Sequence, residues 1–182
     1  WRDKLHAQQV GRLTIAPTWQ ADGLDPATTV VIDPGMAFGT GDHPTTRGAT
    51  RLMQEVVHPG LVVADLGAGS AVLSIAAAKL GASRVFAVEY DADAISNAEE
   101  NVERNAVEGI VHVFEGDATV FLPLVAPVDV VVANIISSVL VELLPAMHAA
   151  LRPGGHAVLA GILLEEKEFM LEALHSDGWR LE

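Results

Sequence analysis

A short apolar run that ends in an acidic glycine turn is the feature that most constrains the fold of this chain. Residues 61–66 are apolar except for Asp65, and the pattern Asp-x-Gly-x-Gly continues through Gly67 and Gly69 into a helical pattern. A second apolar run ends in Glu89, 22 residues after Gly67. The ends of neighbouring parallel strands lie side by side, so the Glu89 carboxylate could bind ribose hydroxyls next to the turn. The pattern predicts a crevice for a ligand that contains adenosine.

Downstream of the turn, apolar runs alternate with helical patterns. Strands separated by helices imply right-handed crossovers and a parallel sheet, with the ligand at the carboxyl ends of the strands. We expect Ser70 to cap the helix that follows the turn and Gly81 to end it. The predicted fold class is therefore α/β, with a doubly wound, mostly parallel sheet of the Rossmann-like type. The expected strands cover 61–66, 84–89, 111–115, 128–133 and 156–160, and the expected helices cover 45–57, 70–80, 92–105, a segment with Pro145 that ends at 151, and about 165–176.

The chain divides by pattern into two parts. Residues 1–44 form an N-terminal segment with strand-forming patches at 13–15 and 30–32, followed by a loop with three glycines and Phe38. Such a loop could act as a lid over a bound ligand. Residues 45–182 hold the alternating pattern and are expected to form the ligand-binding domain. A length of 182 residues suits a single globular unit overall.

Composition limits the partners of the chain. Eleven Lys and Arg against 24 Asp and Glu give a net charge of −13, which opposes binding to a phosphate backbone, and no basic cluster is visible. The least polar stretch, 130–141, is interrupted by Asn134 and two serines and falls short of the ~18 apolar residues that a membrane span needs. The chain contains no Cys, which fits a reducing compartment. We expect a soluble cytoplasmic protein with neither nucleic acid nor membrane as a direct partner.

The turn itself narrows the choice of ligand. A dinucleotide fingerprint needs a third glycine three residues after Gly69, where this chain has Val72, and no Gly-Lys-Ser/Thr follows as a P-loop would require. Asp65 would repel phosphate and attract a cation. S-adenosylmethionine carries an amino group and a sulfonium but no phosphate, so it suits Asp65, Gly67, Gly69 and Glu89 together. An ordinary strand-to-helix turn is the alternative interpretation.

Other polar residues lie at predicted element ends. Asn134 follows a strand, where its carbonyl oxygen could accept a hydrogen bond from a substrate amine, or it could cap the helix that begins near Ser137. Thr46 begins a helix, where its hydroxyl could cap the helix or bind a ligand carboxylate. The seven histidines are scattered along the chain, so His43 is not expected to bind a metal. Asp117 could reach an adenine amino group, or it could belong to a surface turn.

Three segments together resemble the ribosomal protein L11 methyltransferase family. Members carry a Pro-Gly-x-Ala-Phe-Gly-Thr-Gly-x-His-x-Thr-Thr loop, an Asp-x-Gly-x-Gly-Ser-like turn and an Ala-Asn-Ile/Leu motif, and the chain matches them at 34–46, 65–70 and 133–135. The resemblance implies a class I S-adenosylmethionine-dependent methyltransferase. It also implies that Thr46, Gly67, Glu89 and Asn134 contact the cofactor or lie beside the transferred methyl group. The family usually has Asp at the position of Glu89.

The resemblance implies methyl transfer to amines of ribosomal protein L11, both lysine side chains and the α-amino group, with Asn134 as the catalytic residue. L11 or another basic protein would be the partner, and the oligomeric state is left open. Alternatives are methylation of another protein lysine, as in relatives that act on the electron-transfer flavoprotein β subunit, and a cofactor-binding module without turnover. A nucleic-acid methyltransferase lacks support, since no Asn-Pro-Pro-aromatic motif stands at Asn134, and a nicotinamide dehydrogenase is a more distant alternative. Family members normally have a separate N-terminal recognition domain, and we expect this chain to be the catalytic part, ending in a sixth strand.

Overall fold

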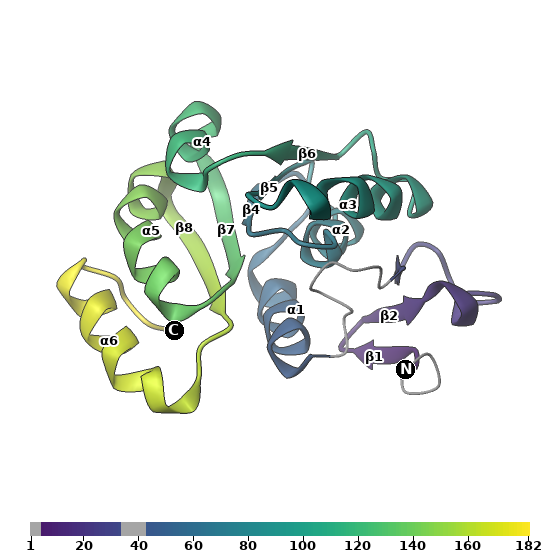
Figure 1. Ribbon diagram of the computed structural model, residues 1–182, viewed down its shortest axis with the longest axis horizontal. Coiled ribbons are helices and arrows are strands. Elements are labelled where there is room, and N and C mark those ends of the chain that lie inside the picture. The colour runs from purple at the N-terminus through teal and green to yellow at the C-terminus, as the bar shows by residue number, and fades with distance from the viewer. Residues whose placement is uncertain (1–4, 34–42) are drawn as a thin grey trace.

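The computed structural model describes residues 5–33 and 43–182 and contains two sheets (Figure 1). The larger sheet has five parallel strands in the order β6-β5-β4-β7-β8. The chain runs outward from β4 through β5 to β6 and then returns to the other side of β4 with β7. Ligands of open α/β sheets bind outside the strand ends at such a reversal. The strands are β4 (Val62–Leu66), β5 (Arg84–Glu89), β6 (Val111–Glu115), β7 (Val128–Asn134) and β8 (Leu151–Ala160).

Helices cover both faces of this sheet, which confirms the predicted α/β fold class and the five predicted strands of the parallel sheet (Figure 1). Successive strand residues point to opposite faces. Val130 and Val132 belong to the apolar cluster with α1, α2 and α3, whereas Val131 and Ala133 belong to the cluster with α4, α5 and α6. Burial on both faces explains why β7 is apolar without alternation. The helices are α1 (Pro44–Val56), α2 (Val72–Lys79), α3 (Ala92–Arg104), α4 (Ala118–Val125), α5 (Ser137–Ala150) and α6 (Lys167–Ser176), with short 3-10 turns η2 (Thr18–Gln20) and η3 (Leu164–Glu166).

The smaller sheet is formed by the N-terminal segment. Strand β1 (Gln8–Val10) pairs antiparallel with β2 (Leu13–Pro17), and β2 pairs parallel with β3 (Thr29–Ile32), which confirms the two predicted strand-forming patches. Val10, Ile15 and Ile32 are buried in the same apolar cluster as α2 and α3. The end of β3 is thereby held next to the helices that follow the glycine turn.

Three local expectations differ from the structure. Helix α2 begins at Val72 rather than Ser70, and its N-cap is Ala71, which has a left-handed φ of 64° and makes no side-chain capping hydrogen bond. Helix α4 was not expected, since its eight residues are mostly apolar and include Pro123. Residues 179–182, expected as a strand, form neither helix nor strand. Within the described ranges, every helix is too short or too polar to cross a membrane.

Candidate functional site

The glycine turn lies at the reversal point of the large sheet. The amides of Gly67 and Ala68 both donate to the Val88 carbonyl oxygen, at 2.8 and 3.1 Å. Gly67 has a φ of +71°, and a Cβ added there would stand 2.5 Å from the Ile135 Cγ2 atom. Both the backbone conformation and the space therefore require glycine. The turn is enclosed between the end of β5 and the residue after β7.

Glu89 is the last residue of β5, and the structure brings it to the turn as the spacing predicts. Its Oε2 atom accepts a hydrogen bond from the Gly69 amide at 2.7 Å, and its Oε1 atom accepts one from the Asp91 amide at 2.8 Å. An ionised carboxylate offers about four acceptor positions, so each oxygen keeps capacity for a further donor. The carboxylate is thus fixed beside the turn, with acceptor capacity for ligand hydroxyls.

Asp65 lies behind the turn and is buried, with 1% of its surface exposed. Its Oδ2 atom accepts a hydrogen bond of 2.6 Å from the Ser74 hydroxyl, whereas its buried Oδ1 atom has no hydrogen-bond partner within residues 5–33 and 43–182. Burial raises the pKa of Asp65 to about 6, with a smaller contribution from the Glu89 charge, while the Ser74 hydrogen bonds oppose the rise. A cation placed beside this carboxylate would favour its charged form.

Asn134 ends β7 and faces Thr46, the third residue of α1. Its Nδ2 atom donates to the Thr46 hydroxyl oxygen at 3.3 Å, and its buried Oδ1 atom has no hydrogen-bond partner in the described part of the chain. Helix α5 begins after Ile136 without a side-chain capping hydrogen bond, so interpreting Asn134 as a helix cap is wrong. The amide is therefore held through its nitrogen and keeps an oxygen available as an acceptor.

These residues form one arrangement because β4 and β7 are neighbours. Leu66 pairs in register with Ala133, which places the turn after Leu66 beside Asn134 after Ala133. The structure thus brings the turn together with Glu89, and Asn134 together with Thr46, at the same edge of the sheet. A hollow of about 950 Å³ along β8 and residues 178–182 is lined by none of the predicted site residues.

Two other candidates cap helices. The His43 Nδ1 atom accepts a hydrogen bond from the Thr45 amide at the start of α1. Asp117 accepts hydrogen bonds from the amide and hydroxyl of Thr119 at the start of α4, and those bonds lower its pKa. Asp117 therefore lies in the turn before α4, where it is the N-cap residue of that helix. The expected lid falls mostly on residues 34–42, which lie outside the described residues.

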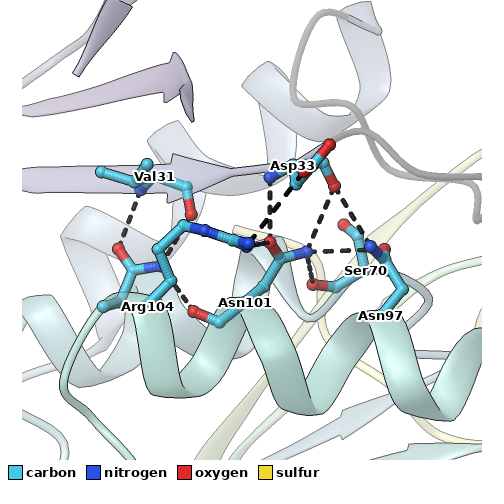
Figure 2. A network of polar contacts seen from close by, with 7 residues as sticks. Val31, Asp33, Ser70, Asn97, Asn101 and Arg104 are labelled. Atoms are coloured by element: carbon cyan, nitrogen blue, oxygen red, sulfur yellow. Dashed lines mark hydrogen bonds and ion pairs between the residues drawn. The ribbon is translucent and has the colours of Figure 1, made fainter. Parts of the chain in front are cut away.

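Sequence reasoning missed the residues that support the turn. Ser74 was not singled out, although it is the hydrogen-bond partner of Asp65. Asn97 and Asn101 of α3 and its C-cap residue Asn105 were also missed. Figure 2 shows Asn97 and Asn101 in a polar network with Asp33 and Ser70, and Asn105 bonds to Val31 of β3. Their spacing of four places them on one face of a helix, which was the available signal.

Comparison with known proteins identifies a family and related sequences. The family model described as "Ribosomal protein L11 methyltransferase (PrmA)" matches residues 1–182. The ribosomal protein L11 methyltransferase of Symbiobacterium thermophilum is 40% identical over 189 residues, covering 100% of this chain and 59% of that protein. The one from Dechloromonas aromatica is 45% identical over 155 residues, covering 85% of this chain and 50% of that protein. The chain thus spans about three fifths or less of these curated relatives.

Solved structures extend the comparison to the fold. A ribosomal protein L11 methylase from Lactobacillus delbrueckii subsp. bulgaricus superposes with a TM-score of 0.82 at 30% identity, covering 97% of this chain and 91% of that chain. An RNA methyltransferase from Salinibacter ruber, solved with S-adenosyl-L-homocysteine, gives a TM-score of 0.53 at 28% identity and covers 59% of this chain and 70% of that chain. The fold is that of class I methyltransferases, and the chain belongs to the ribosomal protein L11 methyltransferase family.

Proposed function

We propose that this chain binds S-adenosylmethionine at the glycine turn and transfers its methyl group to amines of ribosomal protein L11, both lysine side chains and the α-amino group. The observation that carries the proposal is a pair of buried oxygens, Asp65 Oδ1 and Asn134 Oδ1, that have no partner among the described residues. Both lie at the carboxyl edge of neighbouring strands. Buried polar atoms are normally hydrogen-bonded, so this pair points to a ligand with donors and positive charge. A ribosomal-protein substrate would place the enzyme in the cytoplasm.

The residues present fit the cofactor. When bound, S-adenosylmethionine would supply an activated methyl group on a sulfonium. Asp65 would favour the positive charge, the Glu89 carboxylate would accept hydrogen bonds from the ribose hydroxyls, and Gly67 and Gly69 would admit the ligand close to the backbone. Thr46 would contact the ligand from α1. The comparison with a methyltransferase solved with S-adenosyl-L-homocysteine supports this choice of cofactor.

Asn134 would orient the substrate amine. A lysine amine has a pKa of about 10.4, so it must lose a proton before it can attack the methyl carbon. The Thr46 hydroxyl holds the Asn134 amide nitrogen, which leaves the amide oxygen facing the site as an acceptor. A hydrogen bond from the amine to this oxygen would direct the nitrogen lone pair toward the methyl carbon. Positioning of the amine and exclusion of water would then be the main contributions to the rate.

The domain boundaries follow as part of the proposal. We assign residues 45–182 to the cofactor-binding domain and residues 1–44 to an N-terminal segment of the same globular unit. The contacts of β3 with α2 and α3 support a single unit.

Methyltransferase activity on a different protein lysine and cofactor binding without turnover are the alternatives, the second because the chain spans about 59% of a curated relative.

The test compares the wild-type protein with Asn134→Ala in two assays. Isothermal titration with S-adenosyl-L-homocysteine measures cofactor binding, and mass spectrometry of L11 incubated with S-adenosylmethionine measures transfer. We expect the variant to keep its affinity within about threefold and to lose about 100-fold or more in turnover, as for the loss of a positioning group. Equal turnover in the variant would remove Asn134 from the mechanism. If the wild-type protein binds the cofactor but transfers no methyl group, it is a cofactor-binding module without turnover. If it methylates other basic proteins but not L11, its substrate is a different protein.

A further inference from the structure

Three asparagines, two in α3 and one at its C-cap, bond to the end of the small sheet, and one of them also bonds to the glycine turn. Asn97, Asn101 and Asn105 are spaced by four residues and therefore share a helix face. Figure 2 shows the amide groups of Asn97 and Asn101 directed toward Asp33 at the end of β3, and the network continues to Ser70. Asn101 is fully buried and Asn105 is 6% exposed. Polar side chains at this depth must have defined partners.

Asn105 bonds to β3 and to its own helix. Its Oδ1 atom accepts from the Val31 amide at 2.8 Å, and its Nδ2 atom donates to the Val31 carbonyl oxygen at 2.7 Å. The same Nδ2 atom also donates to the Asn101 carbonyl oxygen. The side-chain amide therefore takes the place of a neighbouring strand residue. This bond pattern fixes β3 on α3 and makes no contact with the turn.

Asn101 makes the additional connection to the turn. Its Oδ1 atom accepts from the Asp33 amide at 2.9 Å and from the Arg104 guanidinium at 2.7 Å. Its Nδ2 atom donates to the Ser70 carbonyl oxygen at 3.1 Å and more weakly to the Asp33 carbonyl oxygen at 3.4 Å. One buried side chain thus bonds to the backbone at the end of β3 and to the backbone after Gly69.

The Ser70 carbonyl belongs to the peptide group that sets the shape of the turn. The next residue, Ala71, has a left-handed φ of 64°, which is unfavourable by about 1 to 2 kcal/mol for a residue with a side chain. Such conformations persist only where surrounding contacts determine them. The nitrogen of this peptide donates to the Ala68 carbonyl oxygen at 2.8 Å, and its oxygen accepts from Asn101. The peptide is therefore fixed at both ends.

The opposite side of the turn is held by β5. The Gly67 and Ala68 amides donate to the Val88 carbonyl oxygen, and the Gly69 amide donates to Glu89. Asn101 supplies the matching support from α3. Without it, the peptide between Ser70 and Ala71 would keep only the hydrogen bond from its nitrogen to the Ala68 carbonyl oxygen.

We propose that Asn101 is a positioning residue for cofactor binding, which acts by donating to the Ser70 carbonyl and so holding residues 67–71 in their binding shape. The inference rests on the proposed function in one respect, namely that the turn binds S-adenosylmethionine. In this proposal Asn101 acts through Ser70 and needs no contact of its own with the cofactor. It also ties the turn to Asp33, the residue that precedes the glycine-rich segment.

The test uses two variants that make the same chemical change on the same helix. Asn101→Asp keeps the acceptor for the Asp33 amide but replaces the donor to Ser70 with an oxygen. Asn105→Asp makes the same exchange toward Val31 and leaves the turn untouched. Each position also has a cation close by, since Arg104 bonds to the Asn101 side chain and Lys79 donates to the Asn105 carbonyl oxygen. Both variants therefore introduce the same negative charge near a cation.

We expect Asn101→Asp to weaken S-adenosyl-L-homocysteine binding about tenfold or more, which corresponds to the loss of one hydrogen bond and a new repulsion. Asn105→Asp should bind within about threefold of the wild type, although urea unfolding should show both variants to be less stable. The amide resonances of Gly67 and Gly69 should shift in Asn101→Asp and stay unchanged in Asn105→Asp. Equal affinity and equal glycine resonances in the two variants would overturn the proposal.

A second measurement needs no variant and covers the case in which Asn101→Asp does not fold. In the wild-type protein, adding S-adenosyl-L-homocysteine should shift the side-chain amide resonances of Asn101 and leave those of Asn105 in place. An unchanged Asn101 signal in the bound protein would contradict the inference. If the wild-type protein fails to bind the compound at all, the proposed function is wrong, whereas the glycine resonances of the variants still report whether Asn101 shapes the turn.

Discussion

Asp65 is the site residue whose charge depends most directly on its surroundings. Burial raises its pKa to about 6, so the folded protein holds this proton more tightly than the unfolded chain does. The resulting stabilisation is complete below the unfolded pKa of about 4 and is lost as the pH rises through about 6. At neutral pH the protein therefore keeps a buried, half-satisfied carboxylate, which is a strained arrangement unless a cation binds nearby.

Replacing Asp65 with Asn removes this titration. The stability of Asp65→Asn relative to the wild type should rise by about 2 kcal/mol between about pH 4.5 and about pH 7.5, as measured by urea unfolding. Ser74→Ala is the matched control. It removes a hydrogen bond that lowers the Asp65 pKa, so its unfolding free energy should depend on pH more steeply than that of the wild type. A relative stability of Asp65→Asn that does not change with pH would show that the Asp65 pKa is ordinary.

Site residues could be predicted from the sequence where few residue types can fill the role, as with a glycine in a tight turn or a carboxylate that accepts hydrogen bonds. The glycine pattern and the position of Glu89 at a strand end were sufficient to bring the two together, and the structure confirms their contact. The support for the turn was not predictable in the same way. Asn101 acts on Ser70 across 31 residues of sequence, and no local pattern around either residue signals that hydrogen bond.

At the scale of elements, apolar runs predicted the five strands of the large sheet, although β8 begins at Leu151 rather than at 156. The starts of helices were harder to predict. Ser70 is a residue type that favours an N-cap, yet the left-handed backbone at Ala71 delays α2 to Val72. The eight residues of α4 are mostly apolar and lead into β7 through Pro127, so a polar helix face was absent as a signal. Contacts with distant parts of the chain therefore determine both where α2 begins and that α4 forms.

Two glycine substitutions test whether the turn between β4 and α2 forms the binding site. Gly67→Ala combines a left-handed φ with a clash against Ile135, so it should destabilise the protein by about 1 to 3 kcal/mol and abolish S-adenosyl-L-homocysteine binding. Gly60 has a φ of +90° and open space where a Cβ would stand, and it lies before β4 at the far end of the strand. Gly60→Ala should lose stability from backbone strain alone and keep its affinity. Normal binding by Gly67→Ala, measured by calorimetry, would show that the turn does not form the site.

At the scale of the whole molecule, one sheet positions residues from distant parts of the chain. The reversal between β4 and β7 brings the turn, Glu89 and Asn134 to one edge, and α1 adds Thr46. The small sheet is joined to this edge through β3 and α3 (Figure 2). Fold-level reasoning predicted the edge because ligands of open α/β sheets lie at the carboxyl ends of the strands. It predicted neither the order of the strands within the sheet nor the packing of the N-terminal segment.

Net charge gives a prediction at the same scale. The chain carries a net charge of −13, so it should attract a basic protein substrate over long range, and salt should screen that attraction. The KM for L11 should rise severalfold between about 50 mM and about 500 mM salt, while the KM for S-adenosylmethionine changes less. Steady-state kinetics at several salt concentrations measure both. A KM for L11 that is independent of salt would show that charge does not guide the substrate.

The central claim is that the turn, Glu89 and Asp65 form the cofactor site and that Asn134 lies beside it, and a crystal structure of this chain with S-adenosyl-L-homocysteine tests it most directly. We predict that the ligand lies at the ends of β4, β5 and β7, with the Glu89 carboxylate within hydrogen-bond distance of the ribose hydroxyls and the amino group on the side of Asp65. A ligand bound elsewhere, for example in the hollow along β8, or a structure in which Glu89 stays apart from the ribose, would contradict it.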